Sequence, residues 1–228
     1  MSKSSKIKLF VTLLVLTVAW IVIIKSVDVA NSGPNNTEIG LSSVNTGFRD
    51  LFFDKANDYF EQIYKITEYL GYLALLVCGC IGCVGLYQLI KRKSLLKVDR
   101  PIIVTGVLYV VTIGLYVLFE KVIINFRPVI MEGETEPEAS FPSSHTMLII
   151  VVMGSVVMLA GYYFKQKNAV LCGIVQAVAV FLTVAVIAGR LVCGVHWLTD
   201  IVGGVLISLT LLALYSIFYV GKPKFVEE

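Results

Sequence analysis

Residues 169–188 read AVLCGIVQAVAVFLTVAVIA, an uninterrupted run without a charged side chain. About 20 apolar residues are enough for an α-helix to cross the hydrocarbon core of a bilayer. Soluble domains carry about 25% charged residues along the chain and do not normally contain such a run. This stretch therefore predicts a transmembrane helix and assigns the chain to the membrane proteins.

The rest of the chain has the same character. Of its 228 residues, 57% are hydrophobic and 15% are charged, and the net charge of +3 comes from 19 basic and 16 acidic residues. This composition excludes a disordered chain, and the scattered charge does not fit a nucleic-acid-binding surface. The ten-residue alternating segments typical of a membrane β-barrel are absent from the sequence. We predict an all-α, polytopic six-helix bundle that forms one domain over residues 1–228, with spans near residues 9–24, 71–90, 102–119, 147–164, 169–188 and 201–220.

The basic residues predict how these spans are oriented. Twelve of the 19 Lys and Arg residues fall in alternate loops on one side, together with both termini. The positive-inside rule places that side in the cytoplasm. The loops Lys25–Leu70, Glu120–Thr146 and Gly189–Asp200 are then extracytoplasmic. Small size and short loops suit a multi-pass protein of a bacterial plasma membrane. No cleavage site of the A-x-A kind follows Ile24, so we expect the first apolar stretch to be a membrane helix and not a cleaved signal sequence.

Residues 46–66 form a polar-apolar pattern in the first outer loop. Aromatic and aliphatic side chains recur there at spacings of three and four, with Arg49 and several carboxylates on the other face. Asn45 or Thr46 is suited to cap the start of a helix. We expect an amphipathic helix on the outer membrane surface that anchors the loop or admits a lipid substrate.

Small residues cluster in the second span. Cys78, Cys80 and Cys83 lie there without the second half of a zinc ligand set, so we expect neither a metal site nor a disulfide. Close packing of helices through small residues is the better interpretation. The glycines that accompany the cysteines are Gly71, Gly79, Gly82 and Gly85.

The chain has two histidines, His145 and His196, and both are predicted on the outer side at the mouth of a span. Arg127 and Arg190 lie at the same membrane boundary. Each residue alone fits an ordinary snorkelling arginine or a hydrogen-bonded interfacial histidine. Because ionisable groups are costly at such positions, the convergence of all four on one face predicts a functional site.

Two of three local patterns predict an anion site. Lys121 and Arg127 follow the third span, and a cationic pair of this kind suits a multiply charged anion. Pro142, Ser143 and Ser144 precede the fourth span, where backbone N–H groups of a helix N-terminus and hydroxyl groups bind anions. His145, one residue further along, can donate a proton to a group bound there.

The third pattern joins the last two spans. His196 and Asp200 are four residues apart, so a helix that starts near His196 puts them on one face. The carboxylate can then hold the imidazole in one tautomer, as in a nucleophile with its orienting group. With Arg190 nearby, these groups fit a phosphoryl-transfer pocket, in which positioning and charge stabilisation supply most of the catalysis.

These patterns resemble the signature of the type 2 phosphatidic acid phosphatase superfamily, which reads K-x6-R-P, P-S-G-H and S-R-x5-H-x3-D. The third motif matches at Arg190, His196 and Asp200, with Gly189 in place of Ser, and the second matches with Ser144 in place of Gly. In the first motif Arg127-Pro128 matches, but Lys121 stands one position too close, because Glu120 occupies the family's lysine position. Order, spacing and sidedness agree over Lys121–Asp200.

The resemblance implies a metal-independent phosphatase without a cofactor, acting on a membrane lipid phosphate or pyrophosphate. It implies that His196 forms a phosphohistidine, that Asp200 orients it and that His145 protonates the leaving oxygen. It further implies phosphate binding by Lys121, Arg127 and Arg190 with the groups around Ser143 and Ser144. Undecaprenyl pyrophosphate, phosphatidylglycerophosphate and phosphatidic acid all fit as substrates.

Three alternatives remain at this point. The same face would suit a transporter or a non-catalytic lipid-phosphate binder, although the middles of the spans lack the charges typical of transporters. A degenerate family member would keep the fold without the activity. A metal-dependent hydrolase would need the acidic loop, which we interpret as a solvated lid; its carboxylates are Glu132, Glu134, Glu136 and Glu138.

Overall fold

A computed structural model describes residues 2–55 and 58–219 of the chain. Its α-helices are α1 (Lys3–Ser26), α2 (Ser42–Arg49), α3 (Glu61–Arg92), α4 (Arg100–Lys121), α5 (Ser144–Tyr163), α6 (Ala169–Val192) and α7 (Leu198–Phe218), with short 3-10 turns at Pro34–Asn36 and Leu95–Lys97. Within the described ranges the only extended pairings are two isolated bridges. Among the described residues, six helices are long and apolar enough to cross a membrane, and they correspond to the six predicted spans. The predicted all-α membrane fold is therefore confirmed.

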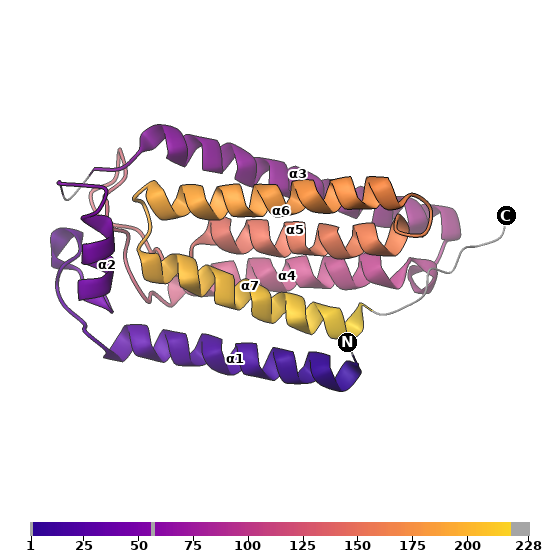
Figure 1. The fold of residues 1–228 in the computed structure, drawn as a ribbon, viewed down its shortest axis with the longest axis horizontal. Coiled ribbons are helices and arrows are strands. Elements are labelled where there is room, and N and C mark those ends of the chain that lie inside the picture. Colours follow the sequence, from indigo (N-terminus) through magenta and orange to yellow (C-terminus); the bar gives the residue numbers. More distant parts are fainter. Residues whose placement is uncertain (1, 56–57, 220–228) are drawn as a thin grey trace.

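The long helices run antiparallel to one another in chain order, so the start of α1 and the end of α7 lie at the same end of the bundle (Figure 1). The ammonium group of Lys6 near the start of α1 donates to the carbonyl of Ser216 near the end of α7, at 2.6 Å. Helix α5 lies centrally and contacts α3, α4, α6 and α7, whereas α1 packs against α7 alone among the described elements.

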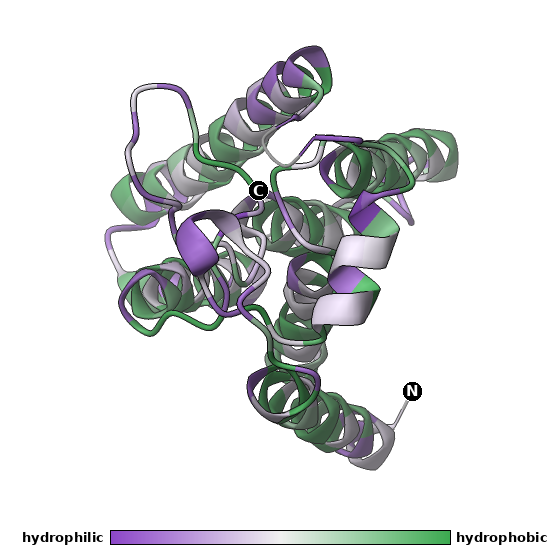
Figure 2. Ribbon diagram, turned by 90° about the vertical axis from the view of Figure 1, so that its left-hand side faces the viewer, coloured by the Kyte–Doolittle hydropathy of each residue, from purple (hydrophilic) through white to green (hydrophobic). Residues whose placement is uncertain are grey.

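The bundle exposes apolar side chains on its outside. In the apolar spans of α5 and α7, 56% and 50% of the residues are buried. In the spans of α1 and α3, only 11% of the residues are buried in each. Figure 2, viewed from the end that carries α2, shows hydrophobic helices and more hydrophilic loops and helix ends. Apolar helix surfaces of this extent are stable in lipid, where they meet hydrocarbon instead of water.

The predicted amphipathic helix over residues 46–66 has different bounds. Helix α2 ends at Arg49, the described residues between it and α3 are non-helical, and only the last part of the segment, residues 61–66, belongs to α3. Two residues of this segment, 56 and 57, lie outside the described residues. The N-cap of α2 is Leu41, whose backbone lies in the left-handed region, so the predicted caps at Asn45 and Thr46 are wrong.

A buried arginine explains the break after α2. Arg49 was expected on a solvated face, but its guanidinium is buried and donates to the carbonyls of Gly194 and Asp58, both at 2.7 Å. It also stacks on the ring of Phe53, 4.8 Å from the centroid. These long-range contacts outweigh the local periodicity and bring the outer segment onto the loop before α7.

The second-span glycines divide into two groups. A Cβ at Gly71 or Gly85 would collide with His145 or Ile102, so close packing holds there. A Cβ at Gly79 or Gly82 would have no atom within 4 Å among the described residues. The prediction of small-residue packing therefore applies to the ends of this span and not to its middle.

Candidate active site

The predicted polar residues meet at one end of the bundle. The N-terminal ends of α3, α5 and α7 and the C-terminal ends of α4 and α6 lie there, on the same side as α2 (Figure 1). His145 comes from the first turn of α5, Arg190 from the last turn of α6 and His196 from the α6–α7 loop. Arg127 lies in the segment between α4 and α5. Antiparallel packing therefore gathers residues that are far apart in the sequence.

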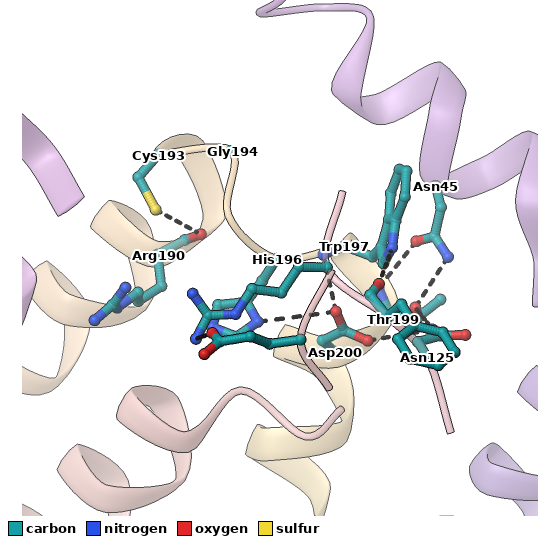
Figure 3. Close-up of polar contacts among 12 residues, drawn as sticks. Asn45, Asn125, Arg190, Cys193, Gly194, His196, Trp197, Thr199 and Asp200 are labelled. Carbon is teal, nitrogen blue, oxygen red and sulfur yellow. Dashed lines mark hydrogen bonds and ion pairs between the residues drawn. The ribbon is translucent and has the colours of Figure 1, made fainter. Parts of the chain in front are cut away.

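His196 faces the carboxylate of Asp200. Nδ1 of the imidazole lies 3.9 Å from Oδ2 of Asp200, and neither side chain is appreciably exposed (Figure 3). Oδ2 accepts the backbone N–H of Trp197 at 2.9 Å, the contact that begins α7. The carboxylate is thus held by the helix start, with His196 beside it, and Nδ1 of His196 has no hydrogen-bond partner among the described residues.

The surroundings of His196 disfavour its protonated form. Burial lowers its pKa well below the ordinary value, and the positive charges of Arg127 and Arg190 lower it further. A neutral imidazole has a lone pair on one ring nitrogen and can act as a nucleophile. The environment therefore favours the neutral form of His196.

Arg190 is a buried cation with free donors. Its side chain is 1% exposed, and its guanidinium lies over the ring of Tyr64 in α3, 4.8 Å from the centroid. Nε and Nη2 have no hydrogen-bond partner among the described residues. Stacking orients the guanidinium and leaves these N–H groups for a ligand.

Arg127 is partly neutralised by the acidic loop. Its Nη2 lies 3.1 Å from Oε2 of Glu138, and its backbone N–H donates to the carbonyl of Glu138 at 2.8 Å. Its Nε has no partner in the described parts of the chain. Glu136 accepts a hydrogen bond from Asn35 at 2.7 Å, which ties the acidic loop to the first outer loop.

Within residues 2–55 and 58–219, no group of three or more His, Cys, Asp or Glu side chains is arranged to hold a metal ion.

The N-terminus of α5 contributes hydroxyl and amide groups. Ser143 is the N-cap, yet its hydroxyl makes no capping bond and has no partner among the described residues. Its own N–H donates to the carbonyl of Asp200 at 3.1 Å, so that amide is not free to bind phosphate as the sequence suggested. The uncapped first turn of α5 remains available to an anion.

A pocket beside His196 opens at this end of the bundle. Its lining includes His196, Arg127 and Ser144, the apolar side chain of Met147, and Glu120. Lys121 does not line the pocket and is exposed at the end of α4. Neighbouring helical residues point about 100° apart, so the last turn of α4 presents Glu120 where the family motif has lysine.

The sequence did not reveal three residues that shape this site. Tyr64 stacks on Arg190, Gly71 gives room to His145, and Asn125 donates to Asp200 at 3.2 Å. A single amide between Ile124 and Phe126 in an apolar stretch is a weak signal of a buried hydrogen-bonding residue. The sequence indicated close helix packing at Gly71, but neither Tyr64 nor Gly71 carries a local signal of a role at the site, because these roles depend on a neighbouring helix.

Comparison with known proteins identifies the family. The model described as the PAP2 superfamily matches residues 69–223 of the chain. This chain belongs to the PAP2 superfamily. The matched range extends from α3 to beyond α7 and contains Arg127, His145, Arg190, His196 and Asp200.

A solved structure shares the PAP2 fold of this chain. It is the crystal structure described as the first transmembrane PAP2 type phosphatidylglycerolphosphate phosphatase from Bacillus subtilis, with a TM-score of 0.64 and 17% sequence identity. The alignment covers 91% of the present chain and 94% of the Bacillus subtilis chain. No curated protein matches the present PAP2 chain.

Proposed function

We propose that this chain is a lipid phosphatase that hydrolyses a phosphomonoester or pyrophosphate of a membrane lipid through a phosphohistidine on His196. Membership of the PAP2 superfamily and the likeness to a membrane phosphatase support the reaction class. Undecaprenyl pyrophosphate, phosphatidylglycerophosphate and phosphatidic acid are the candidate substrates. The proposed chemistry needs no metal ion.

A set of buried donors without partners carries this proposal. Nε and Nη2 of Arg190, Nε of Arg127 and the hydroxyl of Ser143 are all buried and unpaired within the described part of the chain. Leaving such groups unpaired costs about 1 to 3 kcal/mol each, and more for charged groups. A phosphoryl group beside His196 would accept these hydrogen bonds and offset that cost.

The proposed first step is an in-line displacement. Nε2 of neutral His196 attacks phosphorus, the bond from phosphorus to the lipid oxygen breaks, and the electron pair leaves with that oxygen. His145 supplies the proton that converts the leaving oxygen to a hydroxyl or phosphate. Arg127 and Arg190 stabilise the charge on the phosphoryl oxygens, which is where such sites obtain most of their acceleration.

The second step releases phosphate. A water molecule attacks the phosphohistidine while His145, now neutral, accepts its proton, and the phosphorus–nitrogen bond breaks. Asp200 faces Nδ1 of His196 throughout and stabilises the positive charge on the phosphorylated imidazole. Both residues return to their starting forms, so the cycle consumes one water per phosphate.

The position of the site suits a lipid head group. The pocket lies at the end of the bundle, and Phe119 of α4 and Met147 of α5 contribute apolar side chains to its lining. A head group can reach His196 there while its tail stays in the bilayer. We further propose that both termini are cytoplasmic and that the site is extracytoplasmic, in a bacterial plasma membrane.

Phosphate release by the purified protein tests the function. The candidate lipids are supplied in detergent micelles with a chelator present, and His196→Gln, which keeps the volume of the side chain, is compared with the wild type. We expect release by the wild type and none by the variant. Lipid binding without release would favour a non-catalytic binder or degenerate member, and activity that returns only with a divalent metal would overturn the mechanism.

A further inference from the structure

Asp200 has a second hydrogen-bond donor on the side away from His196. Nδ2 of Asn125, in the segment after α4, lies 3.2 Å from Oδ1 of Asp200 (Figure 3). Both side chains are 0% exposed. The carboxylate is therefore held at both oxygens, by the N–H of Trp197 at Oδ2 and by Asn125 at Oδ1.

The amide of Asn125 is itself held in one orientation. Its Oδ1 accepts the backbone N–H of Gly40 at 3.3 Å, and its Nδ2 also donates to the hydroxyl oxygen of Thr199 at 3.2 Å. Since a backbone N–H can only donate, Oδ1 must face Gly40 and the NH₂ group must face Asp200. The amide cannot turn over without losing these bonds.

We propose that Asn125 is a positioning residue for the reaction on His196, a role that rests on the proposed function. Its NH₂ group fixes the carboxylate plane of Asp200 so that Oδ2 faces Nδ1 of His196. Without Asn125, Oδ1 would lose the hydrogen bond that fixes it, and the carboxylate would be free to rotate toward another donor. Rotation would remove the charge that stabilises the phosphorylated imidazole.

A second buried amide provides a matched control. Asn45 in α2 donates to the carbonyl of Gly40 at 2.8 Å and to the hydroxyl oxygen of Thr199 at 3.0 Å, and it accepts the N–H of Thr199 at 3.2 Å. It is 1% exposed. Asn45 and Asn125 thus share the same neighbours, Gly40 and Thr199, but of the two amides only Asn125 donates to Asp200 (Figure 3).

The test compares Asn125→Leu with Asn45→Leu in the full-length protein, with phosphatidic acid micelles as substrate. Each variant loses one buried amide, so we expect similar falls in unfolding temperature. We expect kcat to fall about 10- to 100-fold in Asn125→Leu at unchanged KM, as for the loss of a hydrogen bond to a charged group, and to stay near wild type in Asn45→Leu. Equal losses of kcat in the two variants, or a wild-type kcat in Asn125→Leu, would overturn the proposal.

A third variant decides the matter if the leucine variants do not fold. Asn125→Asp keeps the size of the side chain but can donate to Asp200 only while the carboxyl pair shares a proton. We expect its kcat to fall as the pH rises from about 6 to about 9, relative to the wild type. A parallel pH profile would contradict a role for the donor. If the wild type releases no phosphate from any lipid, the proposed function fails, whereas an active wild type with insensitive Asn125 variants refutes only the positioning role.

Discussion

Gly71 of α3 lies directly against the imidazole of His145 in α5. A Cβ at position 71 would be 2.7 Å from Cδ2 and 3.0 Å from Nε2 of His145. Because real Cβ contacts are longer, any side chain at this position must displace the imidazole or the helix. The absence of a side chain at Gly71 is thus a condition for the observed position of His145.

Gly71→Ala should therefore lower the activity, although the substitution should not destabilise helix α3 itself. Alanine favours a helix over glycine by about 1 kcal/mol, but the new methyl group pushes the proposed proton donor away from the substrate. A displacement near 1 Å can cost up to about 100-fold in kcat. Gly79→Ala in the same helix is the control, since a Cβ there has no described atom within 4 Å. Steady-state phosphate release checks both, and equal kcat values would contradict the argument.

The two arginines should matter far more than Lys121. Arg190→Ala and Arg127→Ala each remove donors that face the proposed phosphoryl group, so each should lower kcat about 10²- to 10³-fold. Lys121 is exposed at the end of α4 and, unlike Arg190, offers no buried donor without a partner, so Lys121→Ala should change kcat by no more than about twofold.

Orthovanadate inhibition supplies a second measurement for the same residues. The ion mimics pentacoordinate phosphorus, so it should inhibit the wild type in the presence of chelator and lose potency in Arg190→Ala. Lys121→Ala, with its side chain outside the pocket, should keep the wild-type potency. A loss in Lys121→Ala as large as in Arg190→Ala would show that the lysine reaches the ligand.

Stability should depend on pH through His196. Its pKa in the folded protein is lowered well below the ordinary value, first by burial. Below about pH 6.5 the unfolded chain binds a proton at His196 that the folded chain does not, so the free energy of unfolding falls as pH falls. Between about pH 7 and about pH 5, the unfolding temperature of His196→Asn should fall less than that of the wild type. Thermal unfolding in detergent measures this, and identical slopes would contradict the shift.

Thiol labelling tests the proposed orientation. Glu134 and Lys93 are exposed residues at opposite ends of the bundle, one in the acidic loop and one after α3. In a background with the five native cysteines replaced by serine, Glu134→Cys should react with an impermeant reagent outside intact cells. Lys93→Cys should react only after the membrane is opened, and the reverse pattern would invert the topology.

The six spans could be predicted because hydrophobicity is a local property that sums along a run such as residues 169–188. The motif residues could be predicted as well, since Arg190, His196 and Asp200 are separated by spacings that a loop and one helical turn keep intact. The bounds of the helices in the outer segment, residues 46–66, could not be predicted in this way. Its apolar period continues past Arg49, but the guanidinium bonds to Gly194, about 145 residues further along the chain.

The sequence by itself determined the membrane class, the helical spans and the residue types of the site, because these depend on composition and on short spacings. Tertiary structure alone decided that Glu120 rather than Lys121 lines the pocket, that Gly71 makes room for His145, and that Asn125 holds Asp200. Each of these depends on the rotation of one helix against another or on a contact between distant segments. Such contacts form only when the antiparallel helices bring their ends together, and no local pattern encodes them.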